Sequence, residues 1–156
     1  MSLSSLVRVA HFRPWHDGRV SERDVLFAIY EEALVTTFDP IEQEWIDPAL
    51  ECLSRGEPAI VMTAYNPGTA RPTWAENEAA NARMLEVLRS RGCEVWQADG
   101  FSPDGTWREP GWLVWRMSID EGTGIAGDFG QFAVYAYDDE GVRTVVACQP
   151  QSPDAS

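Results

Sequence analysis

The stretch from residue 59 to residue 92 limits the fold of this chain more than any other. It opens with "AIVMTAY", a nearly continuous apolar run with β-branched residues, which is typical of a buried strand. A loop then leads to a helix whose start is marked by Thr73 and Glu76, the two residues of a capping box. Basic residues followed by Gly92 mark the end of that helix. A buried strand followed at once by a long helix predicts a helix packed on a β-sheet.

The rest of the chain predicts further elements of the same kind. Helices are expected over residues 22–32, 48–55 and 120–129, and strands over residues 33–38, 93–98, 112–118, 131–137 and 142–148. Strands alternate with helices, but tight turns join several neighbouring strands, so we expect an α+β (mixed α/β) fold. We predict one domain over residues 21–148, with a mixed β-sheet of about five to six strands and two to four helices packed on it. Residues 1–20 are predicted as a poorly defined N-terminal segment and residues 149–156 as a disordered tail.

The chain is strongly acidic, with a formal net charge of −13 and a pI near 4.4. Such a surface repels phosphate backbones and anionic lipid, so neither nucleic acid nor a membrane surface is expected as a partner. A small polar molecule or a basic protein partner fits this charge. The three cysteines are widely spaced, and the chain shows neither a signal peptide nor a membrane-spanning run. These features predict a cytoplasmic protein, and they carry no signal for an oligomeric state.

No cofactor and no metal are predicted. His11, His16 and Asp17 would form only a loose cluster, and no cysteine lies near them in the sequence. The segment from Gly122 to Gly127 fits G-x-G-x-x-G, but only three residues separate it from the next strand, too few for the helix that a dinucleotide site needs. No serine or cysteine lies in a recognisable nucleophile motif. Catalysis by this chain would therefore have to use carboxylates, amides and arginines.

Two amides interrupt the apolar side of the helix that begins after Thr73. By the i, i+3, i+4 rule, Asn77 and Asn81 share one side of the helix with Trp74, Met84, Leu85 and Leu88. Asn66 follows the buried strand and is expected at its carboxyl edge, where ligands bind in open sheets with helical crossovers. These three asparagines therefore point to one end of the predicted sheet.

Other polar residues are expected near the same end. Trp107 and Glu109 lie on the connection that leads into the strand at 112–118, and Gln131 starts the next strand. Arg71 lies on the loop before the helix, and we place it, with Asn81, behind the other residues. Together they could form a pocket of amide and carboxylate groups beside aromatic walls, which suits a neutral polar ligand such as a sugar or a nucleobase.

A structural interpretation of these residues stays open beside the pocket hypothesis. Buried asparagines satisfy the unpaired backbone groups of loops, so Asn77 and Asn81 would then hold the "NPGTARP" loop against the helix. Likewise, Glu109 is either a solvated turn residue or a general acid or base in a cleft. The two interpretations differ in whether the polar groups face a cavity or only the backbone.

Several of these motifs occur in an order that resembles a bacterial family known only as a domain of unknown function, number 3293 in its series. The resemblance rests on Thr63-Ala64-Tyr65-Asn66-Pro67, on Asn77 with Leu88 and Gly92, on Trp107 with Glu109, and on Phe129-Gly130-Gln131. It covers about residues 59–146 and leaves out the first 30 residues. Two features depart from the family's pattern: Gly111 stands where the family has a serine, and glycines weaken the helix near residue 124. The resemblance implies a fold unit and a residue set, with no assigned reaction.

The leading function hypothesis is a small-molecule-binding protein whose enzymatic version would use Glu109 as general acid or base, with the amides orienting the substrate. The alternative is a protein-interaction module, for instance an acidic inhibitor or immunity-type partner of a basic protein. The alternative rests on the net charge of −13 and on the seven tryptophans. It predicts an exposed acidic face with surface tryptophans and no enclosed pocket.

Overall fold

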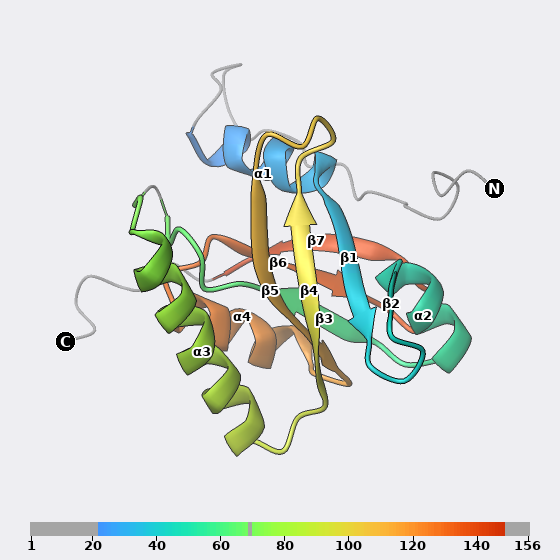
Figure 1. Ribbon diagram of the computed structural model, residues 1–156. Coiled ribbons are helices and arrows are strands. Elements are labelled where there is room, and N and C mark those ends of the chain that lie inside the picture. The colour runs from blue at the N-terminus through green and yellow to red at the C-terminus, as the bar shows by residue number, and fades with distance from the viewer. Residues whose placement is uncertain (1–21, 69, 149–156) are drawn as a thin grey trace.

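The computed structural model describes residues 22–68 and 70–148 (Figure 1). The predicted N-terminal segment (1–20), the predicted tail (149–156) and the two histidines lie outside these residues. The described residues form four helices and a seven-stranded sheet in a single domain, which confirms the α+β class. Among the described residues, no helix is long and apolar enough to cross a membrane.

The elements alternate between helix and strand over much of the chain. Their order is α1 (Glu22–Glu32), β1 (Leu34–Asp39), β2 (Glu44–Ile46), α2 (Pro48–Arg55), β3 (Ala59–Met62), α3 (Trp74–Ser90), β4 (Val95–Phe101), β5 (Arg108–Trp115), α4 (Ile119–Asp128), β6 (Ala133–Tyr137) and β7 (Arg143–Ala147). In the sheet the strands are ordered β2-β1-β4-β5-β3-β6-β7. The strands β3 and β5 are therefore direct neighbours in the sheet, although α3 and β4 lie between them in the sequence.

The prediction of a mixed sheet of five to six strands is wrong. All neighbouring strands in the described residues pair antiparallel. The helices α3 and α4 do connect parallel strands, β3 to β4 and β5 to β6, but in each case an antiparallel strand has been inserted between the two. The alternation of helices and strands along the sequence predicts that a helix connects two parallel strands. It does not predict which other strand lies between those two in the sheet. The additional strand is β2, only three residues long, which pairs with β1 as a short hairpin.

Helix ends were signalled well by the sequence. In α3, Thr73 accepts a hydrogen bond from the backbone N–H of Glu76, and the Glu76 carboxylate accepts one from the backbone N–H of Thr73, which completes the predicted capping box. In α2, the Asp47 carboxylate caps the first turn, and Gly56 ends the helix with a positive φ of 63°. These caps fix where α3 begins and hence where its inward-facing residues lie.

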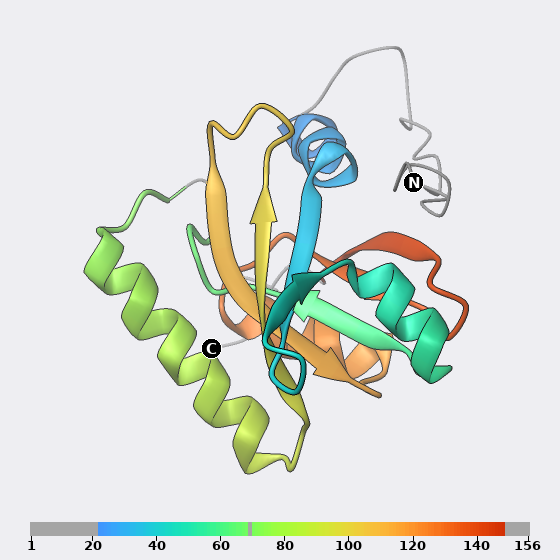
Figure 2. The ribbon, with the colours of Figure 1, turned by 45° about the vertical axis from the view of Figure 1, so that its right-hand side comes forward.

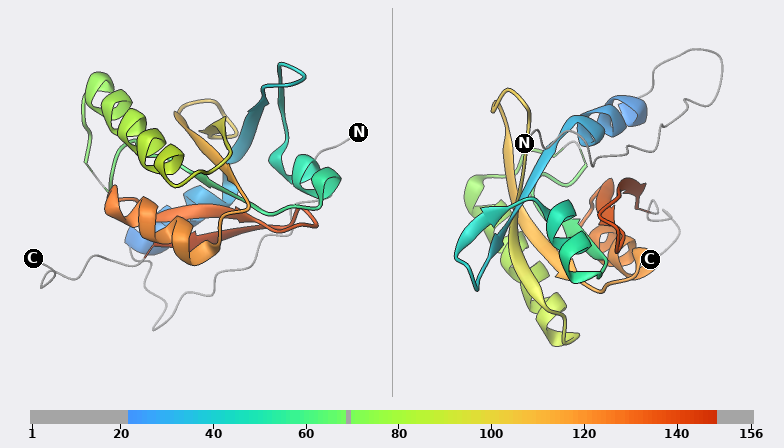
Figure 3. Two further views of the ribbon diagram at one scale, coloured as in Figure 1. Left: turned by 90° about the horizontal axis from the view of Figure 1, so that it is seen from below. Right: turned by 90° about the vertical axis from the view of Figure 1, so that its right-hand side faces the viewer.

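The sheet is buried on both faces, which explains its apolar strands. Neighbouring residues of β3 point to opposite sides: Val61 packs in a cluster with residues of α2, while Ile60 packs in a cluster with residues of α3 and α4. Figures 1–3 show α2 and α3 at opposite sides of the molecule. The helix α1 lies beside the loop of the β4–β5 hairpin, across one end of the sheet (Figures 1 and 2).

Two details of the predicted helix faces are wrong. Trp74 is 73% exposed. It is the first residue of α3, and because helical side chains lean toward the N-terminus, its ring extends beyond the turns that pack on the sheet. In α1, the spacing of Val25, Leu26, Ile29 and Tyr30 predicts an apolar face. Val25 and Ile29 are exposed, while Phe27 is buried and packs edge-on against Phe132. Leu26, Ile29 and Tyr30 of the predicted face are directed toward the sheet, where they line a cavity.

Candidate functional site

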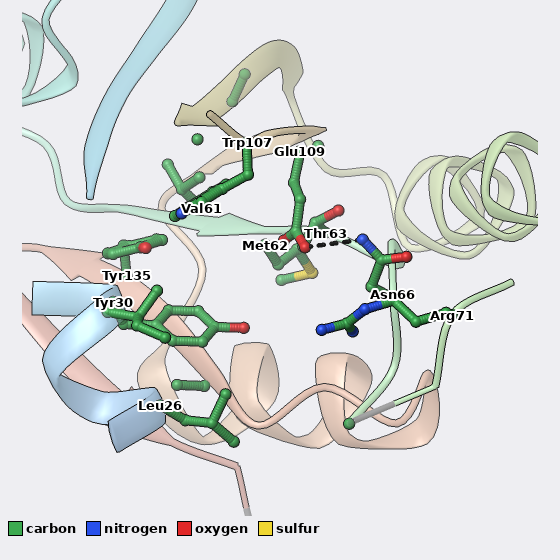
Figure 4. A pocket seen from close by; sticks show the side chains of 16 residues that line it. Leu26, Tyr30, Val61, Met62, Thr63, Asn66, Arg71, Trp107, Glu109 and Tyr135 are labelled. Carbon is green, nitrogen blue, oxygen red and sulfur yellow. Dashed lines mark hydrogen bonds between the residues drawn. The ribbon is translucent and has the colours of Figure 1, made fainter. Parts of the chain in front are cut away.

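A cavity of about 320 Å³ lies between α1 and the face of the sheet that carries Val61 and Tyr135. It occupies the end of the sheet where β3 and β4 finish and where β5 and β6 begin. Its volume is within the range of small-molecule sites. Most of the wall is apolar or aromatic. The lining side chains that carry a polar group are Tyr30, Thr63, Asn66, Arg71, Trp107, Glu109 and Tyr135 (Figure 4).

Glu109 is the carboxylate of this cavity. It lies in β5, opposite Gly100 of β4, and not on the connection where the sequence placed it. The side chain is partly buried, and its Oε1 accepts a hydrogen bond from Nδ2 of Asn66 at 3.1 Å. No described residue donates to its Oε2. Burial raises the pKa of Glu109, while the Asn66 hydrogen bond and the positive charge of Arg71 act against that rise.

Asn66 is held in place by Asn77. The backbone N–H of Asn66 donates to Oδ1 of Asn77 at 2.9 Å, and Nδ2 of Asn77 donates to Oδ1 of Asn66 at 3.0 Å. Asn66 has a φ of 46°, in the left-handed region that residues other than glycine seldom adopt. Asparagine tolerates this conformation better than most residues, and the bonds to Asn77 stabilise it further. The amide of Asn66 is thereby aimed at Glu109.

Asn81 bonds to backbone groups, as the structural interpretation proposes, and Gln131, which was predicted at the pocket, does so as well. Oδ1 of Asn81 accepts from the N–H of Ala64 at 2.8 Å, and its Nδ2 donates to the carbonyl of Pro110 at 2.9 Å. Nε2 of Gln131 donates to the carbonyl of Tyr65 at 3.0 Å. Asn81 and Gln131 are buried and do not line the cavity. They join the segment after β3 to its neighbours and so hold the site together from behind.

Arg71 and Trp107, both predicted from sequence, line the cavity. The guanidinium of Arg71 points from the loop before α3 toward the cavity (Figure 4), and one of its nitrogens donates to the carbonyl of Ala70. No carboxylate of a described residue lies within ion-pair distance of Arg71. Trp107 forms part of the wall on the side of the β4–β5 hairpin. Of the seven predicted site residues, the cavity therefore brings together Asn66, Arg71, Trp107 and Glu109, and Asn77 supports them.

Tyr30 lines the cavity as well, although the sequence did not indicate a role for it at the site. Its hydroxyl points into the cavity on the side of Arg71 (Figure 4), and its ring is tilted against that of Tyr135 at a centroid distance of 5.5 Å. Burial raises the pKa of Tyr30, and the nearby charge of Glu109 raises it further, so the phenol stays protonated at neutral pH. The pattern of residues 22–32 predicted an apolar face but not the part of the sheet that this face covers.

Two residues at the base of the cavity fix the backbone there. The hydroxyl of Thr63 donates to the carbonyl of Pro110 at 2.7 Å and accepts from the N–H of Tyr65 at 3.0 Å. Gly111, which stands where the resembling family has a serine, lines the cavity, and a Cβ added to it would clash with the carbonyl oxygen of Met62. The close approach of β3 and β5 therefore requires glycine at this position.

The G-x-G-x-x-G segment lies inside α4, with Gly122 packed against Ile60. The three glycines of the segment lie within the helix and do not form the loop at a helix start that a dinucleotide site uses. Among the described residues, no group of three histidine, cysteine, aspartate or glutamate side chains is arranged to hold a metal ion. The ligating and reacting groups offered by the cavity are therefore one carboxyl, one guanidinium and phenol hydroxyls.

The site residues predicted from the sequence lie within a segment that matches a known family. Residues 62–134 match the model of a family described as "Protein of unknown function (DUF3293)". The segment is similar to the members of that family. It runs from Met62 in β3 to Val134 in β6, so it includes every predicted site residue but not α1. The resemblance seen in the sequence is confirmed, over a shorter range than residues 59–146. No curated protein and no solved structure matches the chain.

Proposed function

We propose that this protein binds a small organic molecule in the cavity between α1 and the sheet, with Glu109 as the group that recognises it. The observation that carries the proposal is a partly buried carboxyl beside a cavity of about 320 Å³. One of its oxygens is held by Asn66, and the other, Oε2, has no hydrogen-bond donor among residues 22–68 and 70–148. Buried charges are normally paired, because an unpaired one is costly to remove from water. A ligand that donates to Oε2 would satisfy this need.

The arrangement behind Glu109 supports a binding role. Asn77 fixes Asn66, and Asn66 in turn fixes the carboxyl, so the recognition group is positioned by two successive hydrogen-bonded contacts. Positioning of this kind lowers the entropy lost when a ligand binds. The left-handed backbone of Asn66 is a further sign of function, since such strain is retained where the surrounding structure enforces it.

An enzymatic version of this function would use Glu109 as general acid or base. Burial raises the pKa of its carboxyl toward the neutral range in which proton transfer is efficient. The protonated phenol of Tyr30 would serve as a hydrogen-bond donor beside it. Both groups face the same cavity, which would bring a bound molecule into contact with an acid–base residue and a neutral donor.

A thermal-shift screen of metabolites against the wild type and Glu109→Gln tests the proposal. The variant keeps the shape of the side chain and the acceptor for Asn66, but it removes the charge. We expect at least one compound to raise the melting temperature of the wild type and not that of the variant. Glu86→Gln, an exposed change on α3, serves as the matched control and should respond like the wild type. Ligands that stabilise all three proteins equally would place binding elsewhere and contradict the proposal.

A second candidate function, partnership with a basic protein, is favoured by exposed apolar side chains on an acidic chain. Ile41 is 81% exposed, Trp74 is exposed as well, and the net charge is −13. Such a partner would bind at low salt and be released at high salt. Isolation as a lone monomer at every salt concentration would contradict it. This function makes no use of the cavity or of Glu109, so ligand binding is the preferred proposal.

A further inference from the structure

The amides near the cavity are already engaged by the protein. The Asn66 amide donates to Glu109 through Nδ2 and accepts from Asn77 through Oδ1. The amides of Asn77, Asn81 and Gln131 are bonded to Asn66 or to backbone groups. A sugar or a nucleobase is read mainly by such neutral donors and acceptors. Since each of these amides already has a protein partner, the charged groups and the hydroxyl of Tyr30 are the main groups left to recognise a ligand.

Two charged groups of opposite sign have hydrogen-bonding capacity left in the cavity. They are Oε2 of Glu109 and the guanidinium of Arg71, which both line the cavity close to Asn66 (Figure 4). The two are near enough for Arg71 to affect the pKa of Glu109, yet they are not within ion-pair distance of each other. The hydroxyl of Tyr30 points toward the same region from α1 (Figure 4).

The rest of the cavity is suited to an apolar body. Its walls include Leu26, Val61, Ala98, Trp107 and Tyr135. A ligand that fills this space therefore has an apolar or aromatic part and carries its polar groups at one end, where Glu109 and Arg71 lie. Aromatic walls favour flat or aromatic side chains, because ring contacts add to simple apolar burial.

We propose that the ligand is a small zwitterion, an α-amino acid with an apolar or aromatic side chain. Its ammonium group would donate to Oε2 of Glu109, its carboxylate would bind the guanidinium of Arg71 and accept from the hydroxyl of Tyr30, and its side chain would fill the apolar part. This inference rests on the proposed function, since it names the ligand class of the same site.

The charges of the site favour a zwitterion over a singly charged ligand. An amine without a carboxylate would gain from Glu109 but would bring a second cation close to Arg71. A carboxylate without an amine would gain from Arg71 but would bring a second anion close to Glu109. Only a ligand with both charges gives each protein group its opposite without adding repulsion.

Isothermal titration calorimetry with L-phenylalanine, L-leucine and L-tryptophan tests the ligand class. Two truncated analogues of phenylalanine test the need for both charges: 3-phenylpropionate lacks the ammonium group, and 2-phenylethylamine lacks the carboxylate. We expect at least one of the amino acids to bind the full-length protein. Each truncated analogue should bind at least roughly tenfold more weakly than phenylalanine, since it loses a charged hydrogen bond. Glu109→Gln and Arg71→Gln should each weaken amino-acid binding roughly tenfold or more for the same reason. The matched control, Arg83→Gln on the exposed side of α3, should leave it unchanged.

The results separate failure of the ligand class from failure of the site. Truncated analogues that bind as tightly as the amino acid would overturn the zwitterion proposal. The zwitterion proposal would also be overturned if no amino acid bound while the metabolite screen yielded another Glu109-dependent ligand. In that case the proposed function would stand. Absence of any Glu109-dependent ligand would overturn both. Circular dichroism of each variant identifies a loss of binding that is due to unfolding. If Arg71→Gln unfolds, Arg71→Lys, which retains the charge, replaces it. Arg71→Lys is expected to bind the amino acid more weakly than the wild type because lysine cannot bind a carboxylate bidentately.

Discussion

Asn66 and Asn77 bind each other through two hydrogen bonds, one from the backbone N–H of Asn66 at 2.9 Å and one from the amide of Asn77 at 3.0 Å. The pair joins the loop after β3 to the second turn of α3, and it stabilises a left-handed residue at the edge of the cavity. Because Asn66 also donates to Glu109, any change at Asn77 is transmitted to the recognition group without touching the cavity itself.

Asn77→Ala should therefore reduce both stability and binding. Two hydrogen bonds are lost and the N–H of Asn66 loses its partner, which costs about 1–3 kcal/mol. Urea unfolding measures this loss, and the affinity of any Glu109-dependent ligand should fall in the same variant because Asn66 is no longer fixed. Glu86→Ala, an exposed change on the same helix, should alter stability by no more than about 0.5 kcal/mol. Equal stability of the two variants would show that the pair does not brace the loop.

Asn81→Ala should show whether the amide of Asn81 has a structural role or binds the ligand. The change leaves the N–H of Ala64 and the carbonyl of Pro110 without their partner, and we expect a loss of about 2 kcal/mol or more. Since Asn81 does not line the cavity, ligand affinity of the folded fraction should stay close to that of the wild type. Calorimetry well below the melting temperature of the variant measures that affinity. A large drop in affinity with little change in stability would instead assign Asn81 to the ligand site.

Local signals predicted much of this fold, because they depend on residues close in sequence. The capping box at Thr73, the ends of α2 and the hairpin between β6 and β7 all follow from a few neighbouring residues. The strand order cannot be predicted from neighbouring residues, since the insertion of β5 between β3 and β4 joins segments far apart along the chain. The mixed sheet was predicted for this reason, and the three-residue β2 is too short to give a periodic pattern.

The candidate site was predictable to the extent that its residues interrupt apolar patterns. Asn77 and Asn81 stood out on an apolar stripe, and both prove to be buried. What the pattern could not distinguish is an amide that supports a cavity from one that satisfies backbone groups, since both are buried polar residues. Tyr30 escaped notice because a tyrosine on an apolar helix face looks like ordinary core, and its role depends on where α1 lies over the sheet.

Gly111→Ala should destabilise the protein, and Gly124→Ala should do the opposite. A Cβ at position 111 would clash with the carbonyl oxygen of Met62, whereas one at position 124, inside α4, would meet no atom within 4 Å. We expect a loss of about 1–3 kcal/mol for the first change, since the packed strands must move apart. The second should add about 0.5–1 kcal/mol, because alanine favours the helix. Urea unfolding of both variants compares them, and a neutral Gly111→Ala would mean that β3 and β5 are less tightly joined at the cavity.

Glu109→Gln should change how stability depends on pH. Burial raises the pKa of Glu109, so the folded state retains this proton at pH values where the unfolded chain has lost it. Stability of the wild type therefore falls as pH rises from the ordinary glutamate value, about 4.3, through the raised value in the fold. Glutamine cannot ionise, so the variant should gain stability relative to the wild type across that window and keep the gain at neutral pH.

Melting temperatures of both proteins from about pH 4 to pH 8 measure this difference. The exposed change Glu86→Gln removes one negative charge as well, and its difference from the wild type should show no such rise with pH. A ligand whose ammonium group binds Glu109 should reduce the advantage of the variant at neutral pH, because it stabilises only the charged carboxylate of the wild type. A difference between Glu109→Gln and the wild type that stays constant over the whole range would mean that the carboxyl is well solvated, and the reason for assigning it the recognition role would be lost.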